Sequence, residues 1–137
     1  MIKIKSFSYI AGLPGSPSGE QRLAGFLDTL KAAGIAHDEA LRLEGDWTPE
    51  SSYLAAQTLL GRNVDVTCVL AANDDMAIGA AKVFLDAGKR VPQDISLAGF
   101  DDMLIGRLVA ASQGDAILTP PCHHQGRLVI RESVARR

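Results

Sequence analysis

The chain has 137 residues, of which 47% are apolar and 22% are charged. This size and composition are typical of one globular domain and exclude a disordered chain or a fibre. No apolar run approaches the ~20 residues that cross a bilayer, and the start has no apolar stretch of signal-peptide length, so we expect a cytoplasmic protein without membrane contact. The formal net charge of −2 argues against a nucleic-acid surface formed by this chain alone, because phosphate contacts need concentrated positive charge.

The charge distribution divides the chain into two parts. Residues 1–102 hold nine Lys and Arg against 14 Asp and Glu, and they contain all seven aromatic residues; residues 103–137 hold five against two. Without an aromatic residue to anchor a core, the second part is interpreted as a divergent C-terminal tail following a compact body. Cys68 and Cys122 are too few for a disulfide scaffold and are expected to be reduced thiols.

The first strand and helix are marked by turn and capping residues. Residues 3–10 form an expected strand, which a Gly- and Pro-rich turn follows. Ser18 with Gln21 three residues later predicts a capping box at the start of a helix, and Gly34 is expected to end that helix in a left-handed conformation.

A second unit repeats this pattern. Residues 40–43 form a short expected strand, and Thr48 followed by Pro49 predicts the N-cap and first position of a second helix. Gly61 is expected to end that helix.

A third unit completes the alternation. Residues 66–71 are an unbroken apolar run, typical of a strand buried on both faces of a parallel sheet. Asn73 or Asp74 then caps a third helix that Gly88 closes, and residues 95–98 form a fourth strand. The apolar positions expected on this helix are Met76, Ala77, Ala80, Ala81, Phe84 and Leu85. The order predicts an α/β fold, a doubly wound parallel sheet with helices on both faces and ligands outside the carboxyl ends of the strands.

Polar side chains and one indole follow the predicted strand ends. They are Ser16, Ser18, Arg22, Glu44, Asp46, Trp47, Asn73, Asp74, Asp75, Asp101 and Asp102. Carboxylates, amides and guanidinium groups each make two hydrogen bonds in a plane, which suits neighbouring hydroxyls of a sugar or nucleoside, and an indole can pack on an apolar ring face. Taken singly, Asp74 and Asp102 favour helix capping, Arg22 could be a surface charge, and Trp47 favours packing. Their coincidence at one edge is what favours a binding site.

Other chemistries fit less well. The acidic residues Asp74, Asp75, Asp101 and Asp102 could hold Mg²⁺ in a phosphoryl-transfer enzyme, but no phosphate loop accompanies them. Three consecutive residues, Cys122-His123-His124, cannot converge comfortably on one metal ion. His37 is interpreted as a solvent-exposed loop residue. We therefore expect no catalytic residue, metal or cofactor, and the alternatives kept open are the Mg²⁺-dependent enzyme and a subdomain without a ligand.

Five short motifs follow one another along the first hundred residues, preceded by Gly12 with Ser16 and Ser18. They are Arg22-Leu23-Ala24-Gly25-Phe26, Glu44-Gly45-Asp46-Trp47-Thr48, Ala72-Asn73-Asp74-Asp75-Met76, Val91-Pro92-Gln93-Asp94-Ile95 and Gly99-Phe100-Asp101-Asp102. In this order and spacing they resemble the lactose-repressor/galactose-repressor (LacI/GalR) family of transcription regulators. The resemblance implies one subdomain of a type I periplasmic-binding-protein-like fold that senses a sugar or nucleobase-type effector. It also implies that Arg22, Asn73 and Asp101 bind effector, with Ser18 and Trp47 as pocket walls.

The departures from the family pattern are as informative. Family members begin with a helix-turn-helix head, a hinge helix and the first half of the sensor, so this chain is expected to reach DNA only through a head that it lacks. We expect a truncated product or a gene start assigned too far downstream, weak effector binding with a Kd above about a millimolar, and a possible homodimer. After Asp102 the match frays, where Cys122-His123-His124 replaces the usual continuation of the crossover segment.

Overall fold

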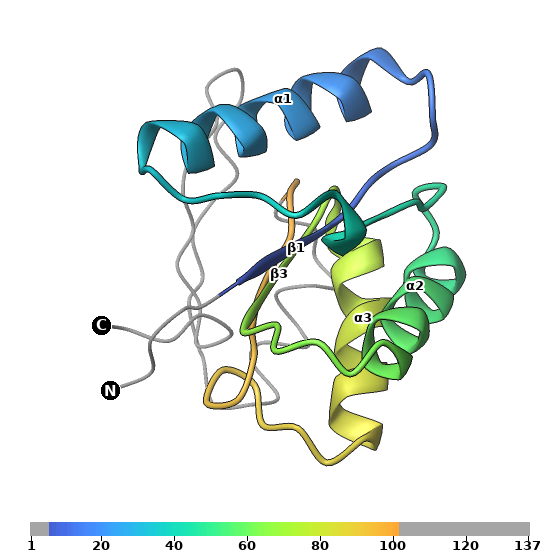
Figure 1. Ribbon diagram of the computed structural model, residues 1–137. Helices are drawn as coiled ribbons and strands as arrows, with labels where there is room; N and C mark the ends of the chain where they lie inside the picture. The colour runs from blue at the N-terminus through green and yellow to red at the C-terminus, as the bar shows by residue number, and fades with distance from the viewer. Residues whose placement is uncertain (1–5, 102–137) are drawn as a thin grey trace, which may run out of the picture.

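A computed structural model describes residues 6–101 (Figure 1). Strands and helices alternate as β1 (Phe7–Ile10), α1 (Pro17–Ala32), the 3-10 helix η1 (Glu39–Leu41), β2 (Arg42–Leu43), α2 (Pro49–Gly61), β3 (Cys68–Ala71), α3 (Asp74–Asp86) and β4 (Ser96–Ala98). The predicted order of elements is thereby confirmed. The predictions for Asp102 and the tail at 103–137 lie outside the described residues. In the described part of the chain, no helix combines the length and apolarity that crossing a membrane requires.

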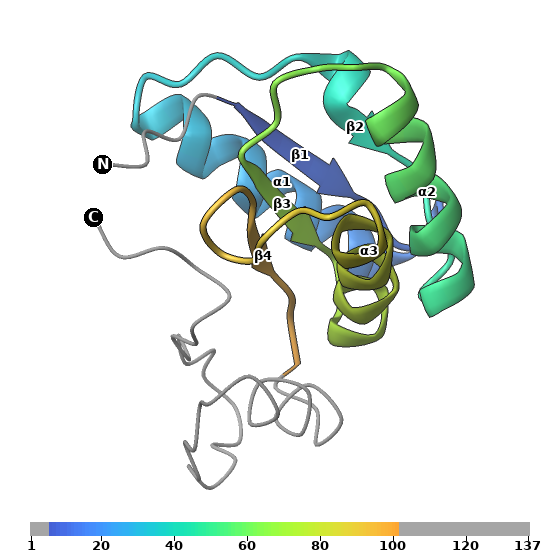
Figure 2. The same cartoon turned by 90° about the horizontal axis from the view of Figure 1, so that it is seen from below.

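The four strands form one parallel sheet in the order β2-β1-β3-β4. Ile10 at the end of β1 is in register with Leu43 of β2 and Ala71 of β3. Helix α1 covers one face of this sheet, and α2 and α3 lie side by side on the other (Figures 1 and 2). The chain changes winding direction between β1 and β3, so the carboxyl ends of these two strands form the topological switch point, where ligands bind in open α/β sheets. The predicted fold class is confirmed.

Two apolar layers hold the helices on the sheet. The ring of Tyr9 packs on Phe26 of α1, with centroids 4.9 Å apart. On the other face α3 contributes buried Met76 and Phe84, and a Cβ at Gly79 would overlap the main-chain carbonyl of Pro49. Burial of large apolar side chains supplies most of the stability, and Gly79 allows α2 and α3 to approach closely.

The start of α1 differs from the prediction. The N-cap is Ser16 and not Ser18, because Pro17 occupies the first helical position, where its fixed φ and missing N–H cost nothing. The Ser16 hydroxyl accepts a hydrogen bond from the N–H of Gly19 at 3.4 Å. The predicted capping box between Ser18 and Gln21 is therefore wrong, and Ser18 is an exposed residue of the first turn.

The remaining caps largely follow the sequence. Thr48 caps α2 ahead of Pro49, and Asn73, one of the two predicted candidates, caps α3. Gly34 and Gly88 have φ values of 67° and 77°, as expected for residues that follow a helix end.

Two local predictions were wrong. Residues 40–43 are only half strand, because Asp38 caps η1 by accepting a hydrogen bond from the N–H of Ala40. His37 is half-buried, with its ring edge-on to Phe26 at 5.5 Å, because the chain after α1 runs back along that helix.

Candidate functional site

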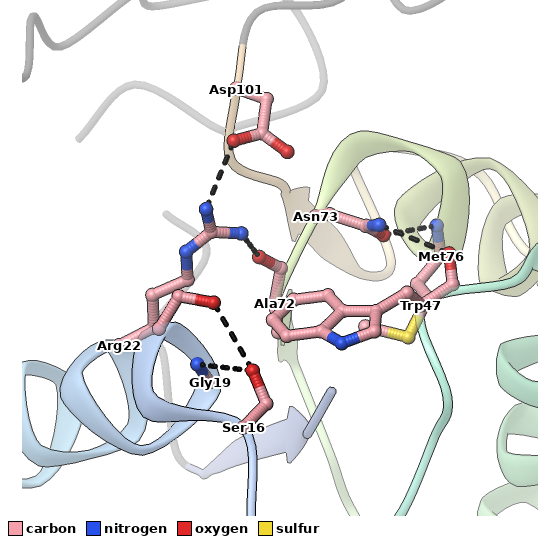
Figure 3. Close-up of polar contacts among 9 residues, drawn as sticks. Ser16, Gly19, Arg22, Trp47, Ala72, Asn73, Met76 and Asp101 are labelled. Atoms are coloured by element: carbon pink, nitrogen blue, oxygen red, sulfur yellow. Dashed lines mark hydrogen bonds and ion pairs between the residues drawn. The ribbon is translucent and has the colours of Figure 1, made fainter. Parts of the chain in front are cut away.

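The carboxyl edge of the sheet brings together residues that lie far apart in the chain. Arg22 comes from α1, Trp47 from the loop after β2, Asn73 from the start of α3, and Asp101 from the segment after β4. Figure 3 draws the side chains of all four close to one another. This convergence is the arrangement that parallel strands with right-handed crossovers produce at their carboxyl ends.

Arg22 makes two hydrogen bonds within the protein at this edge. Its Nη1 donates to the main-chain carbonyl of Ala72 at 2.6 Å, and its Nη2 donates to Oδ1 of Asp101 at 3.1 Å (Figure 3). The side chain of Arg22 is 21% exposed. Because a guanidinium carries five N–H donors, two hydrogen bonds to protein leave others for a ligand.

Two aromatic rings lie near the same guanidinium. Cζ of Arg22 is 4.0 Å from the centroid of Phe100 and 5.2 Å from that of Trp47. Both distances fall within the range of cation–π attraction. Phe100 was not singled out as a site residue, although it immediately precedes Asp101; an aromatic residue beside a carboxylate at a strand end is the signal that could have identified it.

Trp47 is held in an uncommon backbone conformation. Its φ is 74°, in the left-handed region that residues with a Cβ rarely adopt. Its ring lies over two glycines: a Cβ at Gly12 would overlap the ring, and a Cβ at Gly19 would approach it to 3.2 Å. The absence of side chains at Gly12 and Gly19 therefore allows the indole to lie against the loop after β1 and the first turn of α1.

Asn73 uses both ends of its amide within the protein. Oδ1 accepts from the N–H of Met76 at 2.8 Å, and Nδ2 donates to the carbonyl of Trp47 at 3.0 Å. Its residue exposure is 8%. Asn73 thus caps α3 and at the same time holds the loop that carries Trp47.

The two serines at the start of α1 contact each other. Their hydroxyl oxygens are 3.2 Å apart, and Ser16 also serves as the N-cap. Figure 3 places Ser16 beside Gly19, below the ring of Trp47. Ser16 and Ser18 therefore lie at the same edge as Arg22, one turn nearer the start of α1.

Asp46, one of the acidic residues at this edge, has structural partners. Asp46 accepts hydrogen bonds from the side chain and N–H of Thr48, which hold the pKa of its carboxyl below the usual range. Within residues 6–101, no group of three or more His, Cys, Asp or Glu is arranged to hold a metal ion.

Burial also affects one group beneath this edge. Desolvation raises the pKa of the Tyr9 hydroxyl, and the positive charge of Arg22 partly offsets the rise. The buried ring of Tyr9, which packs on Phe26 of α1, therefore lies close enough to Arg22 for the guanidinium charge to act on its pKa.

Comparison with known proteins gives the family. Residues 3–132 match the periplasmic binding protein-like domain family. The chain is 33% identical over 153 residues to the transcriptional regulator AscG of Escherichia coli, covering 95% of this chain and 45% of that regulator. It is 41% identical over 96 residues to the regulator CelR of Thermobifida fusca, covering 70% of this chain and 28% of CelR.

Solved structures agree with these matches. A LacI-family sugar-binding transcriptional regulator from Escherichia coli, solved with phosphate, superposes with a TM-score of 0.78 at 31% identity, covering 94% of this chain and 54% of that one. A complex of the regulator CelR with cellobiose has a TM-score of 0.70 at 39% identity, covering 72% and 30%.

The chain belongs to the periplasmic binding protein-like domain family, and the predicted relationship to LacI-family regulators is confirmed. It spans less than half the length of the relatives that it matches, 45% of AscG and 28% of CelR. The relatives are transcriptional regulators and not enzymes.

Proposed function

We propose that this chain is the effector-sensing part of a LacI-type transcriptional regulator and that it is not catalytic. Its effector is a small molecule of the sugar or nucleobase type, and Arg22, Asp101, Trp47, Asn73, Ser16 and Ser18 form one side of the binding site. In the complete regulator, DNA is bound through a helix-turn-helix head, and the protein works in the cytoplasm.

One observation carries this proposal. The Arg22 guanidinium contacts Ala72, Asp101 and two aromatic rings at the switch point of the sheet, and part of its surface remains exposed. Such a cluster offers paired donors and acceptors for adjacent hydroxyls and an apolar face for a ring. A single surface arginine or a single helix cap would not bring all of these groups to one place.

The residues of this cluster have different roles in the proposed site. Arg22 and Asp101 are partly exposed and supply direct hydrogen bonds, whereas the buried Asn73 acts largely by holding Trp47 in place. Ser16 and Ser18 add hydroxyl groups at the start of α1. The cellobiose complex of CelR supports a sugar as the first effector to test.

We also propose that the chain forms a homodimer. A solved lac repressor dimer superposes with a TM-score of 0.75 at 30% identity, covering 95% of this chain and 55% of that one. Leu54 on α2 and Leu85 on α3 are exposed apolar side chains, as expected of residues that a partner covers.

Titration calorimetry with a panel of sugars and nucleobases, and separately with Mg²⁺, tests the proposal. We expect saturable binding of an organic ligand that Arg22→Ala and Asp101→Ala abolish. Lys31→Ala, which removes a positive charge from the last turn of the same helix, should leave binding unchanged. Saturable Mg²⁺ binding together with turnover of a phosphoester would contradict this proposal and favour a Mg²⁺-dependent phosphoryl-transfer enzyme.

A further inference from the structure

Two hydrogen bonds hold one edge of the planar Arg22 guanidinium. They still allow the group to rotate about that edge, and a contact on its flat face would oppose this rotation. The carbonyl of Ala72 and the carboxylate of Asp101 accept from Nη1 and Nη2, so both hydrogen bonds lie at the edge of the planar group. Arginine loses much rotamer freedom when it is held in one geometry. A ring stacked on the flat face opposes rotation of the guanidinium about that edge.

Phe100 is the aromatic residue nearer to this guanidinium, which lies over its ring. Its ring centroid is 4.0 Å from Cζ of Arg22, closer than the 5.2 Å of the Trp47 ring. The residue is 50% exposed, so burial in the core does not account for where its ring lies. At this distance cation–π attraction acts between the ring and the guanidinium.

The backbone after β4 brings two successive residues onto one guanidinium. In an extended strand, neighbouring side chains point to opposite sides, so Phe100 and Asp101 would not both reach Arg22. The strand ends at Ala98, and Asp101 has a φ of 98°, well outside the extended region. Such a conformation persists where surrounding contacts hold it, and the ion pair from Arg22 to Asp101 is one such contact.

We infer that Phe100 is a positioning residue for Arg22, which it holds in the orientation that serves the effector. The positioning is a property of the unliganded protein; its consequence for affinity rests on the proposed function. In this proposal Phe100 contacts the guanidinium through its ring, while Ala72 and Asp101 accept hydrogen bonds from its edge. Because these contacts together fix the orientation of the group, its remaining N–H donors point in one direction.

NMR of the unliganded chain tests the positioning directly. The Nε–Hε signal of Arg22, assigned by its loss in Arg22→Lys, should carry an upfield ring-current shift and a high heteronuclear NOE. In Phe100→Leu we expect this shift and the NOE to fall, whereas Phe100→Tyr, which keeps the ring, should preserve both. Val64→Ala, which shortens an exposed apolar side chain in the segment between α2 and β3, is the control and should leave the Arg22 signal unchanged. An unchanged Nε–Hε signal in Phe100→Leu overturns the inference.

Binding of cellobiose supplies the second readout. If wild type binds it, Phe100→Leu should weaken the affinity by about threefold to tenfold, and Phe100→Tyr should restore it. In an Arg22→Lys background, Phe100→Leu should add little; an equal loss in both backgrounds would show that Phe100 does not act through Arg22. If wild type binds no ligand of the panel, the proposed function fails, while the NMR result still decides the role of Phe100.

Discussion

The side-chain Nδ2 of Asn73 donates a hydrogen bond of 3.0 Å to the main-chain carbonyl of Trp47, while its side-chain Oδ1 caps α3 by accepting from the N–H of Met76. One amide thus ties the start of α3 to a loop that follows β2, 26 residues earlier in the chain. The Trp47 backbone has a left-handed φ that costs about 1 kcal/mol or more, and this bond helps to offset the cost.

The two bonds of Asn73 can be separated by substitution. Asn73→Asp keeps an acceptor for the N–H of Met76 but places a carboxylate against the carbonyl of Trp47, so it should keep α3 and release the indole. Asn73→Ala removes both bonds and should destabilise the fold by about 1–2 kcal/mol. Trp47 is the only tryptophan in the sequence, so its fluorescence reports the loop while urea unfolding reports stability. Wild-type emission in Asn73→Asp would contradict this division.

A methyl group at Gly12 should displace the indole. Gly12→Ala places a Cβ where the Trp47 ring lies, and such overpacking costs roughly 1–3 kcal/mol. The expected result is altered Trp47 fluorescence together with lost ligand binding. Gly25→Ala on α1 is the matched control, because its Cβ meets nothing within 4 Å, and this variant should gain up to about 1 kcal/mol of helix propensity. A red shift of equal size in both variants would indicate that Trp47 does not lie against Gly12.

A methyl group at Gly79 should separate α2 from α3. Its Cβ would overlap the Pro49 carbonyl and the Ser52 hydroxyl, and because a backbone atom cannot swing aside, Gly79→Ala should cost about 1–3 kcal/mol. Gly61→Ala, at the end of α2 with open space around its Cβ, should leave the urea midpoint near that of wild type. Equal midpoints for the two variants would count against the close contact of the helices.

The pair of Arg90 and Asp94 predicts a dependence of stability on pH. Three hydrogen bonds reach the Asp94 carboxylate: from the side-chain Nε and Nη2 of Arg90 at 2.9 and 2.7 Å, and from its main-chain N–H at 2.7 Å. The side-chain bonds are the main reason that the pKa of Asp94 lies below its usual range.

Because the folded state lowers this pKa, the stabilisation is present above the unfolded value of about 3.9 and is lost as the pH falls below it. Urea unfolding between about pH 5 and pH 2 should therefore show a weaker acid dependence for Asp94→Asn than for wild type. Arg90→Gln, which keeps the main-chain bond, should be intermediate. An acid dependence in Asp94→Asn equal to that of wild type would show that the pair does not contribute.

The order of strands and helices could be predicted because it depends on patterns of residues that are close together in the chain. Proline at the first position of a helix, a polar N-cap and a glycine after the last turn act over a few residues, so Thr48, Pro49 and Gly34 fell where expected. Even these rules compete locally: Ser18 had the capping-box spacing, but Pro17 moved the N-cap to Ser16.

The sequence predicted which residues gather at the candidate site more readily than it predicted the contacts between them. Arg22, Trp47, Asn73 and Asp101 each follow a predicted strand, and parallel strands bring their carboxyl ends to one edge whatever the side chains are. The hydrogen bond from Arg22 to the Ala72 carbonyl was not predictable, because every residue has a main-chain carbonyl and the residue type does not indicate which one accepts.

The amino-acid sequence by itself determined the alternating elements and the edge where polar groups gather, since both depend on periodicity and capping over short distances. Only the tertiary structure decided that Phe100 stacks on Arg22, that His37 is half-buried against Phe26, and that the Asn73 amide holds Trp47. These contacts join residues that are 11 to 78 positions apart, and their geometry depends on how the helices pack on the sheet and on unusual backbone angles, which no local pattern records.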